Sequence, residues 1–469
     1  MVKGYHGYVF FSNLKRRLSF KVECYIIPKM IDSILFKACH YSSPSGLREA
    51  DILVEQGRIT KIEPSLPEHA QVIVKERGLV LIPGAIDPHV HFREPGMTHK
   101  ETIYTGSKAA ASGGVTSFFE MPNTSPSATT RDTVQEKKKI AKDTSLVNYN
   151  FFIGASGDNL DELLLVENVP GIKIYVGSTT GSLLVDKHAP LADIFSKTDK
   201  LIAVHSEDEA IIRENKAHYS MSTSVSDHER IRSVEAAVKC TSFLIDLAMQ
   251  YSTRLHVCHL TTQEELALFQ VSKPNFISTE VTPQHLFLHS PDCYEHLGTY
   301  AQINPPIREK RHRLALWDGL VSGVIDCIGS DHAPHLQSEK DLPFGKAPSG
   351  MPGVETSLPL LLNKVHEGAC SLQDVVRWMC EGPARLFQCR TKGRIEVGYD
   401  ADLVLLDLKK KSQILNERQV TQSGWSAFHG NDIVGWPIAT YVNGQLVYRE
   451  GDFFEDIKGK EVIIGDSLR

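Results

Sequence analysis

Four histidines and one aspartate stand just after short apolar runs in the middle of this chain. His89 and His91 are two residues apart, and side chains at that spacing in an extended segment point the same way, so both imidazoles can face one ion. His205 and His259 follow separate runs and can hold a second ion, and Asp331 follows the last run. Imidazole and carboxylate ligands without cysteine favour zinc, with other divalent transition metals as alternatives. The pattern therefore predicts a metal site.

Lys173 lies within another apolar run and offers a bridge between two cations. The lysine ammonium is repelled by metal ions, but a carbamate formed from Lys173 and carbon dioxide supplies two oxygens and a negative charge. The alternative, a lysine that is simply buried or paired at the surface, stays open because periodicity does not separate the two. Asp331 is expected either as a ligand only or also as the base for a metal-bound water, whose pKa the metal lowers toward ~7. This set predicts a hydrolase that acts on a carbonyl carbon.

A scaffold that gathers the ends of separate strands is needed to bring these residues together. From residue 84 onward, short β-type runs alternate with helical patterns such as Ser233–Met249, which is typical of a parallel sheet with crossover helices. Eight such units predict an α/β fold, a TIM-like (β/α)8 barrel over residues 84–389, with its active site at the C-terminal ends of the strands. The eight runs are Ala85–Ile86, Val115–Phe119, Asn150–Ile153, Ile172–Val176, Leu201–Val204, Arg254–Cys258, Phe276–Glu280 and Val324–Ile328.

The two flanks of the barrel have the pattern of β-structure. Residues 51–62 predict two strands around a glycine turn, and residues 400–407 predict one strand. Residues 439–448 predict a hairpin that turns at Asn443–Gly444. We expect residues 30–83 and 390–469 to come together as a small β-sandwich domain.

Composition argues against several other classes of protein. The formal net charge of −6 disfavours nucleic acid as the main partner. No apolar stretch approaches the ~18 residues that span a bilayer, so no membrane partner is expected. The nine cysteines include no C-x-x-C pair, which disfavours a zinc ribbon or a redox dithiol and is typical of a reducing, cytoplasmic compartment.

Residues 1–29 are set apart by their charge, with six lysines and arginines against the single acid Glu23. Their apolar patch, Tyr8–Phe11, is far shorter than the core of a signal peptide. We expect an upstream extension, or a start codon placed before a working start at Met30. An organelle-targeting peptide is the alternative.

Seven stretches of the barrel carry a more specific signal when they are taken together. They are DPHVHFREPG (Asp87–Gly96), EMPNT (Glu120–Thr124), GIKIYVG (Gly171–Gly177), AVHSED (Ala203–Asp208), HVCHLT (His256–Thr261), INPPIR (Ile303–Arg308) and GSDHAPH (Gly329–His335). In this combination the chain resembles the dihydroorotases of the amidohydrolase superfamily over residues 50–450. The resemblance implies reversible cyclisation of N-carbamoyl-L-aspartate to L-dihydroorotate, the third step of pyrimidine biosynthesis. It also implies a barrel with a β-sandwich, two zinc ions and an N6-carboxylysine at Lys173.

The resemblance also implies a role for each matching residue. Asp331 would be the general acid and base. Lys173 groups the chain with the lysine-bearing members, since some stand-alone relatives have aspartate at this place. One zinc is implied at His89, His91, Lys173 and Asp331, and the other at Lys173, His205 and His259. The residues implied for substrate binding are Arg93, Asn123, Asn304 and His335.

The carboxylate of dihydroorotate gives a separate reason to single out Arg93. A guanidinium can bind a carboxylate bidentately, and Arg93 follows His91 by two residues, so we expect it at the same mouth. The alternative is a structural ion pair with Glu94 or Glu101.

Three further positions are expected around the substrate ring. Asn304 and His335 offer donors for the carboxylate and a ring carbonyl. The stretch Ser349–Gly353, with Gly350 at its second position, either presents backbone N–H groups to the ring amide or forms an ordinary surface turn.

Three functions compete at this point. A dihydroorotase is first; a related cyclic amidase such as a hydantoinase or allantoinase is second, and Arg93 within His-Phe-Arg-Glu-Pro argues against it. The third is a catalytically inactive scaffold that binds a partner enzyme, against which the ligand set from His89 to Asp331 argues. The expected partner is a small-molecule substrate, while a homo-oligomer and association with the preceding pathway enzyme both stay open.

Overall fold

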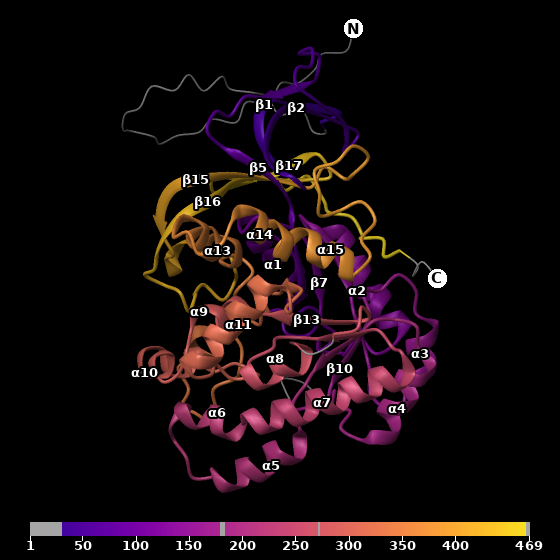
Figure 1. Ribbon diagram of the computed structural model, residues 1–469, viewed down its shortest axis with the longest axis vertical. Helices are drawn as coiled ribbons and strands as arrows, with labels where there is room; N and C mark the ends of the chain where they lie inside the picture. The colour runs from indigo at the N-terminus through magenta and orange to yellow at the C-terminus, as the bar shows by residue number, and fades with distance from the viewer. Residues whose placement is uncertain (1–30, 179–182, 271–272, 466–469) are drawn as a thin grey trace.

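The computed structural model describes residues 31–178, 183–270 and 273–465. A β-rich part lies at one end, and a barrel surrounded by helices forms the rest of the molecule (Figure 1). The basic leader, residues 1–29, and Met30 lie outside the described residues. Within the described ranges no helix has both the length and the apolar character that crossing a bilayer requires. The eight cysteines in these ranges are free thiols.

The barrel strands run parallel and pair in chain order. A bridge between Val90 and His332 connects the first strand to the segment after the last. The third strand is interrupted at Phe152 and therefore has two parts, β8 and β9. All eight predicted runs overlap these strands, which confirms the predicted barrel. The strands are β6 (Ala85–Val90), β7 (Val115–Glu120), β8 (Asn148–Phe151), β9 (Ile153–Gly154), β10 (Ile172–Tyr175), β11 (Ile202–His205), β12 (Leu255–Val257), β13 (Ile277–Val281) and β14 (Cys327–Ile328).

Helices follow the strands and cover the outside of the barrel. The longest, α7, begins after Ser233, whose side chain accepts a hydrogen bond from the N–H of Ala236, and it ends at Ser252 in the left-handed conformation. This helix confirms the predicted helical pattern. The helices are α1 (Ile103–Ser112), α2 (Arg131–Thr144), α3 (Leu160–Leu165), α4 (His188–Lys197), α5 (Glu209–His218), α6 (His228–Ile231), α7 (Val234–Tyr251), α8 (Gln263–Gln270), α9 (Pro283–Phe287), α10 (Asp292–Leu297), α11 (Lys310–Ser322), α12 (Gln337–Lys340), α13 (Ser357–His366), α14 (Leu372–Val376) and α15 (Gly382–Leu386).

Both flanks of the chain join in one nine-stranded sheet, in which β5 pairs with β1 on one side and with β15 on the other. The sheet curves over a shared apolar core, where the rings of Phe36 and Tyr441 meet edge to face at 5.2 Å. Asn443 and Gly444 turn the predicted hairpin with φ values of 49° and 74°. The sandwich built from both flanks is thus confirmed. Its strands are β1 (Ser33–Ser43), β2 (Gly46–Glu55), β3 (Arg58–Glu63), β4 (Val72–Val74), β5 (Val80–Pro83), β15 (Leu403–Gln413), β16 (Asp432–Val442), β17 (Gln445–Arg449) and β18 (Asp452–Phe453).

Residues 414–430, which we call the covering segment, leave the sheet between β15 and β16 and pack on the barrel. The indole N–H of Trp425 donates to the carbonyl oxygen of His335 at 2.8 Å. The buried Trp425 ring belongs to an apolar cluster with Ile303 and Met351. The division of the chain between residues 83 and 84 and between 389 and 390 stays a prediction, and this segment makes contacts across it.

Residues 457–465, the C-terminal tail, pack against the opposite end of the barrel. The side-chain amide of Asn150 on β8 donates to the carbonyl oxygen of Val462 at 2.9 Å. The Val462 side chain joins an apolar cluster that includes Phe119, Phe152 and Phe387. Another member, Cys258, contacts Lys173, so the cluster reaches the wall of the barrel interior.

Candidate active site

One cavity at the C-terminal ends of the barrel strands contains every residue that the sequence assigns to the metal ions. His89 lies on β6, Lys173 on β10 and His205 at the end of β11, while His259 and Asp331 follow β12 and β14. The cavity is lined by His89, His91, Arg93, Asn123, Lys173, Tyr175, His205, His259, Asn304, Asp331, Ala333, Ser349 and Gly350.

His89, His91 and Asp331 meet on one side of this cavity. Oδ1 of Asp331 lies 3.0 Å from Nε2 of His91 and 3.4 Å from Nε2 of His89. Burial alone would raise the pKa of Asp331, but the two facing imidazoles hold it below its ordinary value. Burial would likewise lower the pKa of His89, but the carboxylates of Glu280 and Asp331 raise it to about 10. The charges around His89 therefore favour a cation at this point.

His205 and His259 meet on the other side. Nδ1 of His205 lies 3.1 Å from Nε2 of His259. Burial, together with the neighbouring His205 and Lys173, lowers the pKa of His259 well below its ordinary value. Burial also lowers the pKa of His205. Both rings are therefore neutral and turn ring nitrogens toward the same point, as two ligands of one metal ion would.

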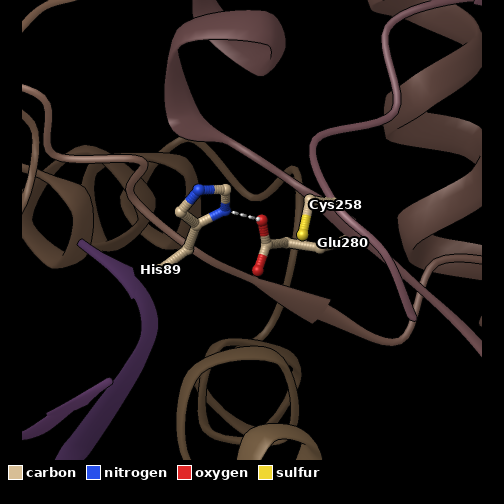
Figure 2. A group of neighbouring side chains, drawn as sticks. All are labelled: His89, Cys258 and Glu280. Carbon is tan, nitrogen blue, oxygen red and sulfur yellow. Dashed lines mark hydrogen bonds and ion pairs between the residues drawn. The ribbon is translucent and has the colours of Figure 1, made fainter. Parts of the chain in front are cut away.

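Buried carboxylates hold the opposite ring nitrogens of two of these histidines. Oε1 of Glu280 lies 2.8 Å from Nδ1 of His89, and Oε2 of Glu207 lies 2.7 Å from Nε2 of His205. Figure 2 shows the imidazole of His89 facing Glu280, with the thiol of Cys258 beside the carboxylate. Such outer partners fix the tautomer of a metal-binding histidine and leave the other nitrogen as the ligand. The donors present therefore fit divalent metal ions.

Lys173 is fully buried in the cavity wall. Its Nζ lies 3.1 Å from Sγ of Cys258 and 5.3 Å from the centroid of the Tyr175 ring. No carboxylate in the described ranges forms an ion pair with it, and a thiol is only a weak acceptor. A buried ammonium is unfavourable without a good partner, so this position fits a modification that removes the positive charge.

Three residues of the site have strained backbone conformations. The φ values are 64° at Arg93, 37° at His259 and 44° at Asp331, although none of these residues is a glycine. Such conformations cost on the order of 1–3 kcal/mol each and concentrate at functional sites. The strain turns three side chains from different strands toward the same cavity.

Arg93 lines this cavity as a buried cation. Its Nε donates to the carbonyl oxygen of Pro334 at 3.2 Å, and burial lowers its pKa to about 10, so it stays charged near neutrality. The predicted alternatives, Glu94 and Glu101, accept hydrogen bonds from the backbone N–H groups of other segments and form no ion pair with Arg93. The guanidinium thus has room for an anionic ligand.

The two asparagines predicted to bind substrate both line the cavity. Oδ1 of Asn123 lies 2.7 Å from Nδ1 of His91, so this side chain also orients a histidine of the candidate metal site. Oδ1 of Asn304 lies 3.1 Å from Nε2 of His228, which holds it from the outside.

Of the other two residues predicted to bind substrate, one lines the cavity and the other lies behind its wall. His335 is absent from the cavity lining and lies behind Arg93, with Nε2 3.2 Å from Nη2 of the arginine. Gly350 lines the cavity, but its N–H already donates to the carbonyl oxygen of Gln302 at 2.9 Å. A Cβ at residue 350 would lie 2.5 Å from the carbonyl oxygen of Ala333, and its φ of 140° favours glycine. Glycine is thus required here by its small size as well as by its backbone conformation.

Several buried or half-buried residues that hold the site in place were not predicted from the sequence. Each is a charged or titratable side chain that the fold brings behind a predicted one. A carboxylate inside a buried parallel strand, such as Glu280 on β13, must have a partner, and this was the one available signal. The residues missed are Lys100, Glu207, His228 and Glu280.

Comparisons with known proteins agree with this geometry. A sequence profile described as "Amidohydrolase family" matches residues 80–447. The dihydroorotase of Methanosarcina acetivorans is 36% identical over 422 residues, which cover 87% of this chain and 90% of that protein. The dihydroorotase of Bacillus subtilis is 34% identical over 413 residues, with 86% and 95% covered.

Solved structures of related enzymes share the whole architecture. The L-hydantoinase (dihydropyrimidinase) from Arthrobacter aurescens superposes with a TM-score of 0.87 at 30% identity, over 92% of this chain and 100% of that chain. The dihydropyrimidinase from Brevibacillus agri has a TM-score of 0.85 at 26% identity, over 93% and 100%. The barrel, the sandwich and the profile match together define a cyclic amidohydrolase. Within that class, the chain belongs to the dihydroorotase family.

Proposed function

We propose that this protein catalyses the reversible cyclisation of N-carbamoyl-L-aspartate to L-dihydroorotate, as a dihydroorotase of pyrimidine biosynthesis. The observation that supports this substrate best is Arg93, a buried guanidinium that lines the cavity and forms no ion pair in the described ranges. A buried charge without a counter-ion is unfavourable, and the carboxylate of dihydroorotate supplies that counter-ion. The related ring dihydrouracil lacks the carboxylate and leaves Arg93 unpaired.

We further propose two zinc ions, with other divalent metals as alternatives. His89, His91 and Asp331 would hold one ion and His205 and His259 the other. Lys173, as an N6-carboxylysine, would bridge them. When bound, such ions act as Lewis acids that activate water and polarise the carbonyl carbon under attack. Support comes from the inward ring nitrogens and from the buried Nζ of Lys173, which has only a thiol as its neighbouring acceptor.

Asp331 moves the proton in this proposal. Its carboxylate is ionised, because His89 and His91 hold its pKa low, and it lies in the cavity. In ring opening the carboxylate takes the proton of the attacking water and delivers it to the departing ring nitrogen. In ring closure it takes the proton from the carbamoyl nitrogen and returns it to the departing oxygen.

Other residues bind and orient the substrate. Arg93 would bind the carboxylate with its guanidinium. Asn123 and Asn304 would offer side-chain amides to the ring, and Gly350 would let the ring approach the backbone. His335 would act from behind Arg93. The cytoplasm is the proposed compartment, and the proposed partner is this small molecule.

The test is turnover by the purified, zinc-supplemented protein in both directions. We expect hydrolysis of L-dihydroorotate near neutral pH and its formation from N-carbamoyl-L-aspartate at lower pH. Dihydrouracil, which differs from dihydroorotate by the missing carboxylate, serves as the matched control. Turnover of dihydrouracil with a kcat/KM equal to or above that of dihydroorotate would contradict the proposal and indicate a hydantoinase. Metal-loaded protein that turns over neither ring would indicate an inactive scaffold.

A further inference from the structure

Lys100 lies in the loop between β6 and α1 and contacts two groups of the α12 region. Its Nζ lies 2.8 Å from Oε1 of Glu339 and 2.9 Å from Nδ1 of His335. An ammonium has only hydrogen-bond donors, so Nδ1 of His335 must accept this hydrogen bond. In a neutral imidazole the hydrogen then has to be on the other nitrogen, Nε2.

Nε2 of His335 has two polar neighbours. The carbonyl oxygen of Ser349 lies at 3.1 Å, and Nη2 of Arg93 lies at 3.2 Å. Because a guanidinium nitrogen is also only a donor, the N–H of His335 can bond to Ser349 but not to Arg93. The contact between His335 and Arg93 is therefore one between two donors, and it leaves the hydrogens of Nη2 without an acceptor on this ring.

This arrangement bears directly on the cavity. Ser349 and Arg93 both line it, and the only hydrogen bond in the described ranges that Arg93 donates to a defined acceptor is the one from Nε to Pro334. The Nη atoms of the guanidinium are thus available to a ligand in the cavity. The imidazole of His335 also holds the loop that carries Ser349, through its hydrogen bond to the carbonyl oxygen.

The charges around His335 keep its ring neutral. Burial is the main cause that lowers its pKa, and the cations of Arg93, Lys100 and Lys340 lower it further, to a value well below the ordinary range. The carboxylate of Glu339 is the facing acid, with Oε2 at 3.8 Å from Nδ1. Three cations against one acid favour the uncharged imidazole on which the donor assignment depends.

We propose that Lys100 is a positioning residue that fixes His335 as the Nε2–H tautomer and so reserves the guanidinium of Arg93 for the carboxylate of the substrate. Without Lys100, the ring can carry its hydrogen on Nδ1 and accept a hydrogen bond from Arg93 through Nε2. The arginine would then be partly satisfied by protein, and the hold on Ser349 would be lost. This inference rests on the proposed function for the identity of the carboxylate, but the tautomer can be tested independently.

The kinetic test compares Lys100→Met with Lys100→Arg, which keeps the charge and the donors. For Lys100→Met we expect KM for L-dihydroorotate to rise about tenfold, the size of one lost charge-assisted bond, while kcat and zinc content stay within about twofold. Lys100→Arg should recover most of the affinity. Lys108→Met removes another lysine that is ion-paired with a glutamate, at 2.7 Å from Glu455, and should change neither constant. Unchanged KM in Lys100→Met would overturn the inference and leave the proposed function standing.

A pH series and a double mutant separate positioning from general damage. In Lys100→Met burial and the cation of Arg93 still hold the pKa of His335 below its ordinary value, so the ring stays neutral and KM should be raised by a similar factor at each pH between about 6 and 8. In a His335→Phe background, Lys100→Met should have no further effect on KM, because its route to Arg93 is gone. An additive effect of the two substitutions would contradict the proposal.

The tautomer itself can be read without turnover. We expect ¹⁵N-histidine NMR of the metal-loaded full chain to show His335, assigned by loss of its signals in His335→Phe, as the neutral Nε2–H form. In Lys100→Met the neutral Nδ1–H form should appear. A wild-type signal of the Nδ1–H form would overturn the inference even if dihydroorotate is turned over. The Nε2–H form in a protein that does not act on dihydroorotate would uphold the tautomer assignment and reject only the proposed function.

Discussion

Oε1 of Glu280 lies 2.8 Å from Nδ1 of His89, and both side chains are almost completely buried. The second oxygen, Oε2, lies 3.5 Å from Nε2 of His256. Burial would raise the pKa of Glu280, but His89 and His256 hold it well below its ordinary value, so the carboxylate is charged. Glu280 thus fixes the His89 ring with Nε2 turned toward Asp331.

Replacing Glu280 by glutamine should weaken metal binding on the His89 side of the cavity. The amide keeps the shape but loses the charge that orients the ring, and such outer partners typically contribute about 10–100-fold in metal affinity. Chelator competition followed by metal analysis measures the affinity of each ion. Glu207→Gln is the matched variant, since Glu207 holds His205 on the other side. Identical loss of both ions in both variants would contradict separate control of the two sides.

Arg93→Met should raise KM for dihydroorotate and leave the metal content intact. The lost charge-assisted bonds typically contribute ~1.5–3 kcal/mol, roughly 10- to 150-fold in binding. Steady-state kinetics together with zinc analysis measure both properties. Unchanged kinetics would remove Arg93 as the carboxylate anchor.

Asp331→Asn should abolish turnover far more than it weakens substrate binding. An amide cannot accept the proton, and a general base typically contributes ~10²–10⁴-fold. The measurement is kcat at saturating zinc, with KM or a binding constant for dihydroorotate alongside it. A variant that keeps more than about a tenth of the wild-type kcat would rule out this role.

Lys173→Ala should lose metal and activity together. In the proposed metal-bound site, four neutral imidazoles and the Asp331 carboxylate would supply one negative charge against two divalent ions, so loss of the proposed bridging carbamate should destabilise the pair. Short carboxylic acids with excess zinc should restore a little of both properties. Intact-mass analysis of the wild-type protein under native conditions should show the added mass of one carboxyl group. A Lys173→Ala protein with both metals and full turnover would disprove the bridge.

Trp425→Phe should raise KM while leaving the zinc content unchanged. The substitution removes the indole N–H that donates to the carbonyl oxygen of His335, a bond that typically contributes about 0.5–1.5 kcal/mol. It also replaces the buried indole with a smaller ring in the apolar cluster. Thermal unfolding measures the loss of stability, and dihydroorotate kinetics measure the effect on the site. Trp436→Phe is the control, since the indole N–H of Trp436 bonds to Ile433 within the sheet at 3.4 Å. An equal rise of KM in both variants would mean that the effect is not specific to the covering segment.

Periodicity and ligand chemistry predicted the barrel, the sandwich and one cavity for the candidate metal ligands. His89 and His91 could be read because two residues of one strand share a face, and the hairpin at Asn443–Gly444 because its turn needs positive φ. Partners far apart in the chain could not be predicted in this way. Lys100 and His335 are 235 positions apart, and nothing local in either segment indicates which side chains the loops will bring together.

The sequence also could not predict which residues line the cavity and which lie behind its wall. His335 and Gly350 were both expected at the substrate, but only Gly350 lines the cavity, because the loop that carries it lies in front of the imidazole. The position of a residue after a strand predicts the end of the barrel at which it lies. It does not predict whether the side chain lines the cavity or packs behind other residues.

The C-terminal tail packs on the barrel at the end away from the mouth of the cavity. Val462 packs there with Phe119, Phe152 and Phe387, so buried apolar side chains occupy that end in the described ranges. The proposed zinc ions, carbon dioxide for a carbamate at Lys173, substrate and product would then enter and leave through the mouth of the cavity. A substrate bound there would slow the removal of the proposed ions by a chelator. It would also slow the exchange of the proposed carbamate with carbon dioxide.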